Sequence, residues 1–433
     1  MRLNFTMPLV IVTLILLSGL ISGCRGGTQS QAENVPSPVN STSPIASIQV
    51  TPNLITPSPI AQSPSPAPPV DMALLKQSWA AYRQRFIQAD GRVIDWEADA
   101  RSTSEGQAYA MLRSVMIDDP QTFALTLAWA EKNLKRGNQP SEALWAWKWG
   151  RNAKKQWGIL DRNFASDADI DAITALILAG RRWNRSAYLT LAQTKLRALW
   201  ALSVVPVGKQ PYLLPGPREA FQQPNKLLLN PSYLSPAAFR LFAQVDRAHD
   251  WLSLVSSSYQ LLERSAALST IQLPSDWLAL DTETAQFQPL LGAEPLVSRY
   301  GFDAYRVWWR LALDASWYGE PRARSYLQQR LVSLQELWRS QQTIPAQIDL
   351  QGKPVVAYEA SSQYGVLYAA FRLIDPKTAE EIYQKKIAPQ YRNGIWDNSS
   401  AYYTQNLVWF GLIPSTAIST QLLHPANVSP THP

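Results

Sequence analysis

The chain has 433 residues, of which 46% are hydrophobic and 17% are charged, and its net charge is +7 at pH 7. This length suits one large domain or two ordinary ones, with ample apolar material for a core. The basic residues occur singly or in short pairs such as Arg181–Arg182, without a long basic stripe, so a nucleic-acid partner is not expected.

The first 24 residues resemble a bacterial export signal. Arg2 precedes an apolar run from Met7 to Ile21, and the next residues are Ser-Gly-Cys. A run this short, ending in small residues, is typical of a cleaved signal peptide rather than of a membrane-spanning helix. Ile21-Ser22-Gly23-Cys24 resembles a lipobox, which predicts lipidation of Cys24 and a protein anchored in the cell envelope, on the periplasmic side or at the outer membrane. The alternative is an ordinary secretory signal in which the sole cysteine occurs by chance.

Residues 25–70 are rich in Pro, Ser, Thr, Gln and Ala, and include repeats such as "TPSPIAQSPSPAPP". Such a segment cannot bury enough apolar surface to fold, so we expect a disordered linker there. Residues 71–415 are predicted to form the folded domain. Residues 416–433 are again rich in Pro and Ser and are predicted to form a flexible C-terminal tail.

The folded part shows helical periodicity throughout, with about twelve candidate helices of two alternating kinds. One kind has a charged face, and its members begin near residues 72, 119, 185, 249, 320 and 377. The other kind is apolar nearly all round, and its members begin near residues 105, 167, 235, 304, 360 and 401. A helix with a charged face lies at the surface and one that is apolar all round is buried. The pattern predicts an all-α protein, an (α/α)6 barrel of six inner and six outer helices.

Three carboxylates, Glu105, Asp167 and Asp303, stand at the starts of predicted inner helices. Each has a structural alternative. Ser104 and Gln107 fit a capping box with Glu105 beside the positive end of the helix dipole, and the two aspartates could each cap a helix. Parallel inner helices would nevertheless bring all three to one rim, and paired carboxylates are the equipment of glycoside hydrolysis.

Other chemistries lack the residues they need. In "SDADID" the acids alternate as in a calcium loop, but Ala172 and Leu178 stand where that loop needs Gly and Glu. The three histidines do not have zinc-site spacing, and the sequence has no G-x-S-x-G motif. We therefore expect neither a metal nor a cofactor.

Four segments carry a family resemblance: "DGRVIDWEADARSTSEGQAYAML" (90–112), "NFASDADIDAITALILAGRRW" (163–183), "LNPSYLSP" (229–236) and "FDAYRV" (302–307). They resemble glycoside hydrolase family 8, and most of all the endoglucanases encoded with bacterial cellulose synthases. The matches run from about Trp79 to Gly411. The resemblance implies an (α/α)6 barrel, which agrees with the helix pattern, and endo-β-1,4-glucanase (cellulase) activity with inversion.

The resemblance also implies a role for each site residue. Glu105 matches the general acid, Asp303 matches the general base, and Asp167 matches the carboxylate that binds and distorts the sugar. Tyr233 and Arg306 match residues around the same subsite. Asp169 is expected to be structural, and Phe302 stands where the family often has a tyrosine.

The "LWAWKWG" segment places Trp145, Trp147 and Trp149 at alternate positions, which would point all three to one side of an extended strand. We interpret Trp147 and Trp149 as a sugar-stacking platform, with a hydrophobic clamp as the alternative. Trp96, Tyr402 and Tyr403 are weaker candidates.

The expected partner is a β-1,4-glucan, with a cellulose synthase complex left open as a second one. Chitosan, mixed-linkage β-glucan and xylan are alternative substrates within the family. A non-catalytic glycan-binding lipoprotein is an alternative from another class, but a binder would need neither an acid nor a base.

Overall fold

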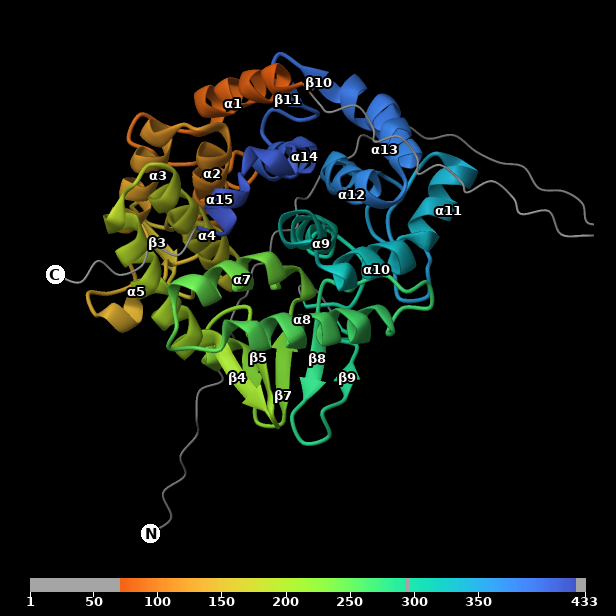
Figure 1. Cartoon of the computed structure of the whole chain (residues 1–433), viewed down its shortest axis with the longest axis horizontal. Coiled ribbons are helices and arrows are strands. Elements are labelled where there is room, and N and C mark those ends of the chain that lie inside the picture. Colours follow the sequence, from red (N-terminus) through yellow and green to blue (C-terminus); the bar gives the residue numbers. More distant parts are fainter. Residues whose placement is uncertain (1–70, 293–295, 426–433) are drawn as a thin grey trace, which may run out of the picture. The chain divides into compact units, whose positions relative to one another are not determined.

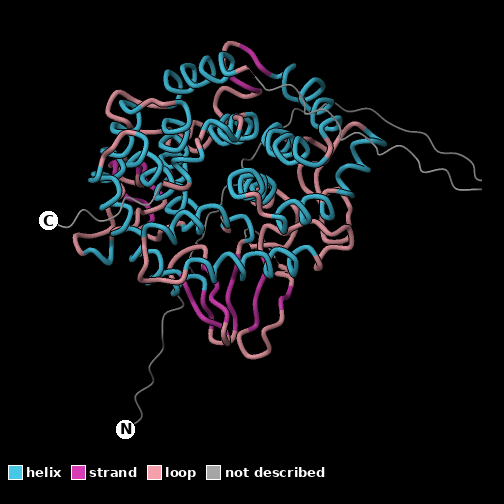
Figure 2. Tube along the Cα trace, viewed as in Figure 1, coloured by secondary structure: helices cyan, strands magenta, loops and turns pink. Residues whose placement is uncertain are grey.

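The computed structural model describes residues 71–292 and 296–425. The predicted signal peptide, Cys24 and the linker lie outside the described residues. The described chain forms a ring of inner helices surrounded by a second layer of helices (Figure 1), and helices predominate over strands (Figure 2). The predicted (α/α)6 barrel is confirmed.

The inner helices are α2 (Ser104–Ile117), α4 (Ser166–Arg182), α7 (Pro236–Val245), α9 (Tyr305–Tyr318), α12 (Ser361–Ile374) and α14 (Tyr402–Leu412). The outer helices are α1 (Met72–Phe86), α3 (Pro120–Asn133), α5 (Ser186–Ser203), α8 (Trp251–Ala266), α10 (Pro321–Arg330), α11 (Val332–Gln341) and α13 (Pro376–Ile382). The single outer helix expected near residue 320 is thus divided into α10 and α11. Short helices occur at α6 (Arg218–Phe221) and α15 (Thr420–Leu423).

Burial separates the two layers as the sequence pattern predicts. In α4 every residue from Ser166 to Gly180 is buried, whereas α10 buries Ala323, Tyr326 and Leu327 and leaves Arg322 and Arg324 exposed. A helix without a polar face is stable in water only inside a layer of other helices. The apolar helices therefore line the barrel axis.

The first and last helices of the barrel close the ring. The Trp409 indole N–H of α14 donates to the Leu75 carbonyl of α1 at 3.1 Å, and Asn406 donates to the Tyr82 hydroxyl at 3.1 Å. The buried Arg113 guanidinium of α2 lies 4.4 Å from the centre of the Tyr82 ring and 4.8 Å from that of Trp409. Cation–π contacts of this kind join α1, α2 and α14.

Short antiparallel strands, which the sequence analysis did not predict, lie in the loops. They are β1 (Ser102–Thr103), β2 (Lys148–Arg151) and β3 (Trp157–Asp161); β4 (Val204–Val207) and β5 (Gln210–Leu213); β6 (Gln222–Gln223), β7 (Lys226–Leu229), β8 (Leu278–Asp281) and β9 (Phe287–Gln288); and β10 (Tyr391–Arg392) and β11 (Ile395–Trp396). Strand β1 runs directly into α2, β7 leads into the 3-10 turn Pro231–Tyr233, and β8 follows Trp277. The strands therefore support the face on which the inner helices begin.

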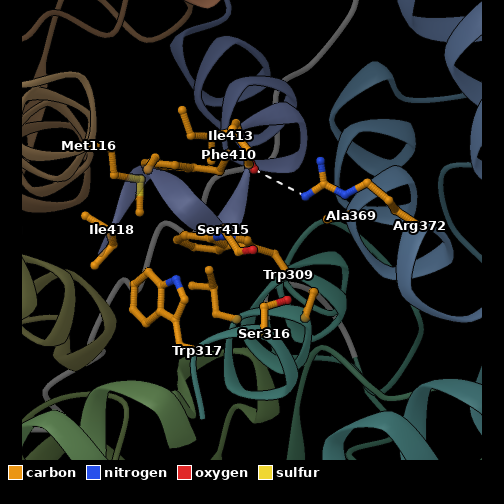
Figure 3. A pocket seen from close by; sticks show the side chains of 14 residues that line it. Met116, Trp309, Ser316, Trp317, Ala369, Arg372, Phe410, Ile413, Ser415 and Ile418 are labelled. Atoms are coloured by element: carbon orange, nitrogen blue, oxygen red, sulfur yellow. Dashed lines mark hydrogen bonds between the residues drawn. The ribbon is translucent and has the colours of Figure 1, made fainter. Parts of the chain in front are cut away.

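The opposite face, where the inner helices end, holds a small, largely apolar pocket (Figure 3). Trp309 of α9 and Phe410 of α14 stack in its wall with ring centres 4.7 Å apart. Arg372 of α12 donates to the Ile413 carbonyl at 3.3 Å at the edge of the pocket. This face carries none of the three candidate carboxylates.

The chain stays folded beyond residue 415, where the sequence analysis placed the start of a flexible tail. Ile418 and Leu423 are buried, and Arg181 donates to the Leu422 carbonyl at 2.6 Å. The apolar side chains among the Ser and Thr residues of this segment explain the difference, because they pack against the barrel. Residues 426–433 lie outside the described part. No helix in the described ranges combines the length and the apolarity needed to cross a bilayer.

Candidate active site

Glu105 lies at the first turn of α2 without acting as part of a cap. Thr103 is the N-cap, and its hydroxyl accepts a hydrogen bond from the Gly106 N–H at 3.0 Å. The capping box expected between Ser104 and Gln107 does not form, because the Gln107 side-chain oxygen accepts a hydrogen bond from the Val93 N–H and the buried Ser104 hydroxyl has no hydrogen-bond partner among the described residues. Glu105 is therefore not needed to start its helix.

The two aspartates do not cap their helices either. Helix α4 has Ala165 and helix α9 has Ala304 at the N-cap position, and neither has a side-chain cap hydrogen bond. Asp167 accepts a hydrogen bond from the adjacent Ala168 N–H at 2.8 Å, and Asp303 pairs with a side chain one turn later. The proposed capping roles of all three carboxylates therefore lose their basis.

A single guanidinium, that of Arg306 on α9, joins the three carboxylates. Its Nη1 donates to Glu105 Oε2 at 2.8 Å and to Asp167 Oδ2 at 2.6 Å. Its Nη2 donates to Asp303 Oδ1 at 2.7 Å and to the Ser232 hydroxyl at 2.9 Å. The Arg306 side chain is 2% exposed, so three acids surround one buried cation. Charge-assisted bonds to a planar guanidinium fix the relative positions of the acids.

Glu105 is the acid best placed to hold a proton. Burial raises its pKa from 4.5 to about 7, and the charges of Asp167 and Asp303 act in the same direction. The Arg306 cation and a hydrogen bond from the Tyr402 hydroxyl, 2.8 Å from Oε1, act against this rise. Near neutral pH a substantial fraction of Glu105 is therefore protonated and able to donate.

Asp303 has a different environment. Its side chain is 26% exposed, against 12% for Glu105 and 4% for Asp167. Burial and the charge of Asp167 raise its pKa, whereas Arg306 lowers it, as do hydrogen bonds from the Asn230 amide at 3.0 Å and from the Trp277 side chain. Asp303 is thus the acid of the three with the greatest access to solvent.

A second ion pair lies one turn below the first. Arg310 of α9 donates through both terminal nitrogens to the Asp171 carboxylate of α4, at 2.7 Å for the Nη2–Oδ2 contact. Both residues lie four positions after the Arg306–Asp167 pair, and side chains at this spacing share one helix face. Two consecutive pairs therefore hold α4 against α9 across the barrel axis.

The chain matches the family model described as "Glycosyl hydrolases family 8" over residues 65–417. The chain belongs to glycosyl hydrolase family 8. It is 37% identical over 275 residues to an endoglucanase of Xanthomonas axonopodis pv. citri (strain 306), covering 63% of this chain and 68% of the relative. It is 28% identical over 350 residues to an endoglucanase of Escherichia coli (strain K12), covering 79% of this chain and 88% of that protein.

The crystal structure of an endo-1,4-D-glucanase from Vibrio fischeri ES114 superimposes with a TM-score of 0.68, at 26% identity, over 77% of this chain and 93% of that chain. A β-1,3-1,4-glucanase from Paenibacillus sp. X4 shares the fold, with a TM-score of 0.67, 17% identity and coverage of 82% of this chain and 96% of that one. The resemblance noted in the sequence is thereby confirmed at the level of the family, and the protein is a glycoside hydrolase.

Tyrosines complete the surroundings of the acids in this glycosyl hydrolase. The Tyr233 ring lies with its centre 5.1 Å from the Arg306 guanidinium carbon, beside the three carboxylates as predicted. Tyr402 and Tyr403, at the start of α14, face the acids from the other side. Tyr402 donates to Glu105, and the Tyr403 hydroxyl donates to the Phe302 carbonyl, just before Asp303, at 2.6 Å. These two tyrosines act as hydrogen-bond donors rather than as the stacking surfaces considered in the sequence analysis.

The three alternating tryptophans do not share one face. Trp145 is buried and its indole N–H donates to Glu131 at 2.9 Å. Trp149 stacks on Trp157 with ring centres 5.0 Å apart and meets the Trp129 ring edge-on at 5.3 Å. Of the three, only Trp149 lies in strand β2, because Trp145 and Trp147 precede its first residue, Lys148.

Trp149 therefore belongs to an aromatic cluster, which favours the clamp alternative. Trp147 stays next to the acid, because its carbonyl accepts a hydrogen bond from the Ser104 N–H at 3.0 Å. Asp169 is fully buried and accepts a hydrogen bond from the Trp145 N–H at 3.2 Å, as expected of a structural residue.

Four contacts to the site were missed in the sequence analysis: those of Tyr109, Asn230, Ser232 and Trp277. Asn230 and Ser232 lie in the "LNPSYLSP" segment, where the resemblance pointed to Tyr233 alone. Nothing in the residues around Trp277 marks it as a site contact. Within the described ranges, no three His, Cys, Asp or Glu side chains are arranged to hold a metal ion.

Proposed function

We propose that this family 8 glycoside hydrolase is an endo-β-1,4-glucanase of the cellulase type that works with inversion of configuration. The observation that carries the proposal is the Arg306 guanidinium bound to three carboxylates, of which Glu105 has a pKa raised to about 7. The names of the relatives support the substrate class, because the first relatives found are endoglucanases.

In the proposed reaction Glu105 donates its proton to the glycosidic oxygen, and the bond from that oxygen to the anomeric carbon breaks. A water molecule attacks the anomeric carbon from the opposite face while Asp303 takes its proton. Asp167 hydrogen-bonds the sugar at the cleavage point and favours its distortion. Arg306 holds the acid and the base in fixed relation, and it also donates a hydrogen bond to Asp167 beside them.

The spacing of the acid and the base is compatible with inversion. The Glu105 and Asp303 oxygens bound to opposite nitrogens of one guanidinium lie at most about 8 Å apart, given the size of that group. Inverting enzymes separate their carboxyl groups by about 6.5–9.5 Å to admit water, and retaining enzymes by about 5–5.5 Å. The greater exposure of Asp303 supports the same assignment, because a base that activates water needs access to it.

Product stereochemistry tests the mechanism. Proton NMR during cleavage of a soluble cello-oligosaccharide should show the α-anomer first, and an initial β-anomer would refute inversion. Glu105→Gln and Asp303→Asn should each lower kcat by roughly 10²–10⁴-fold, the usual contribution of a positioned proton transfer. Near-normal turnover in either variant would remove that residue from its role.

Substrate preference is tested with soluble carboxymethyl-cellulose, lichenan, xylan and chitosan under identical conditions. An endo-β-1,4-glucanase should cleave the cellulose derivative faster than chitosan and reduce its viscosity early, because internal cuts shorten chains quickly. A preference for chitosan, or the release of terminal sugars alone, would contradict the proposed specificity.

The proposal includes attachment to a membrane of the cell envelope through lipidated Cys24 and a role beside a cellulose synthase complex. Its support is the lipobox-like "ISGC" and the family resemblance of the sequence. Cys24→Ser should move the protein from the membrane to the soluble fraction. Equal partitioning of the two forms would refute the anchor. Co-purification of the anchored form with the synthase tests the partnership.

A further inference from the structure

A second buried carboxylate, Asp276, lies behind the proposed base. It stands in the segment that enters strand β8, and it is 7% exposed. Its Oδ1 accepts a hydrogen bond from the Ala304 N–H at 2.7 Å, and its own N–H donates to the Arg299 carbonyl at 2.6 Å. Asp276 therefore forms hydrogen bonds with both ends of the segment 299–304, which carries Asp303.

The contact with Ala304 supplies a missing cap. Helix α9 begins at Tyr305 with Ala304 at the N-cap, and no side chain of its own segment caps it. The first N–H groups of a helix need acceptors from elsewhere. Asp276, which is 28 positions away in sequence, provides one of them directly next to Asp303.

Close packing indicates that the turn is fitted to this carboxylate. A Cβ built on Gly301 would lie 2.5 Å from Asp276 Oδ2, closer than any real contact allows. A side chain larger than glycine would therefore push the carboxylate away from the turn. The next residue, Trp277, hydrogen-bonds the Asp303 carboxylate itself. Asp276 thus binds the backbone next to the base, and Trp277 binds the carboxylate of the base.

We propose that Asp276 is a positioning residue for the base, holding the Gly301–Ala304 turn so that the Asp303 carboxylate faces the attacking water. The inference rests on the proposed role of Asp303. It goes beyond it by assigning the placement of the base to a residue that does not touch the substrate.

The charged groups around Asp276 explain why an acid can occupy this position. Asp303, Arg306 and Arg299 face it, with Arg299 Nε 3.7 Å from Oδ2. Burial first, and then the charge of Asp303, raises the pKa of Asp276 to about 8. At neutral pH Asp276 therefore holds a proton. A neutral asparagine matches such an acid in shape, with one acceptor oxygen and one donor group.

The experiment compares Asp276→Asn with Asp276→Ala in the full chain, using kcat and KM on cellopentaose and the unfolding midpoint. Asp276→Ala should lower kcat by roughly 10–100-fold with KM within about threefold of wild type, because a small displacement of a catalytic group reduces turnover strongly. Asp276→Asn should restore kcat to within about threefold of wild type, because its oxygen still accepts the Ala304 N–H.

Asp246→Ala is the matched control. Asp246 is a buried carboxylate at the end of α7, on the opposite face of the barrel, and it accepts a hydrogen bond from the Trp251 indole at 3.0 Å. Its loss should lower the unfolding midpoint without changing kcat of the folded enzyme. An equal fall of kcat in both alanine variants would overturn the proposal, since it would reflect general damage.

If Asp276→Ala does not fold, Gly301→Ala tests the same positioning role, because its Cβ would displace the Asp276 carboxylate. This variant should show the same selective loss of kcat. The inference is overturned if a folded Asp276→Ala keeps wild-type kcat, if Asp276→Asn is as slow as Asp276→Ala, or if Gly301→Ala has normal kcat. These outcomes leave the proposed function intact. That function would instead fail through an active Asp303→Asn variant or a wild type unable to cleave glucan.

Discussion

Replacing Glu105 with glutamine should make the folded protein more stable relative to wild type as the pH rises. The folded pKa of about 7 lies above the unfolded value of 4.5, so the folded state binds the proton more tightly. Stability that depends on this proton is complete below pH 4.5 and is lost as the pH rises through 7. Glutamine keeps the shape of the neutral acid but does not titrate.

The size of the effect follows from the displacement of the pKa. Each pKa unit corresponds to about 1.4 kcal/mol, so wild type loses about 3 kcal/mol relative to Glu105→Gln between pH 4 and pH 7.5. The Glu105 side chain is 12% exposed, so solvent screens this effect little. The absolute difference at either pH includes the exchange of side chains, but its change with pH isolates the proton.

Urea unfolding of both proteins at pH 4, 5.5 and 7.5 measures this change. Glu320→Gln is a control of opposite sign, because hydrogen bonds from Arg322 and other contacts lower the pKa of Glu320. Its carboxylate stabilises the fold above its unfolded pKa, so its replacement should cost most at pH 7.5. If the difference between Glu105→Gln and wild type does not change with pH, Glu105 ionises like an ordinary glutamate and is not poised to donate a proton.

Three further predictions concern neighbours of the acid. Tyr402→Phe removes a hydrogen bond that lowers the Glu105 pKa, so the alkaline limb of the kcat/KM profile should move to higher pH; an unmoved limb would contradict this link. Arg306→Met should lower the free energy of unfolding by about 3–5 kcal/mol at neutral pH, measured by urea unfolding, because it leaves buried carboxylates without their cation, and by less at pH 4. Trp147→Ala should raise KM for cello-oligosaccharides, whereas Trp149→Ala should lower the melting temperature and leave KM unchanged; the reverse result would restore Trp149 to the substrate platform.

The helices were predictable because the residue types of each segment indicate whether its helix is buried. Segments such as "DAITALILAG" lack a polar face, and the predicted starts of the inner helices near residues 105, 167, 235, 304, 360 and 401 fall within one or two residues of those observed. The strands were missed because they are two to five residues long. Period-two alternation needs about four to eight residues to be detected.

The site itself was only partly predictable. The acids and Arg306 stand in motifs with fixed local spacing, whereas the partners of the acids depend on packing between distant segments. Asn230 donates to a carboxylate 73 positions away, and Tyr402 to one 297 positions away. The alternation of the tryptophans misled because strand β2 begins only at Lys148, so Trp149 lies in the strand whereas Trp145 and Trp147 precede it.

Because the first and last helices close the ring, we expect the active site to be completed late in folding. Leu75 and Trp409 are joined by a hydrogen bond across 334 positions, and bringing such distant segments together is slow. Glu105 obtains its Tyr402 partner only when this contact forms. During refolding from urea, glucan hydrolysis should therefore lag behind the recovery of helical circular dichroism. The recovery of turnover would then measure the rate at which α1 and α14 come into contact.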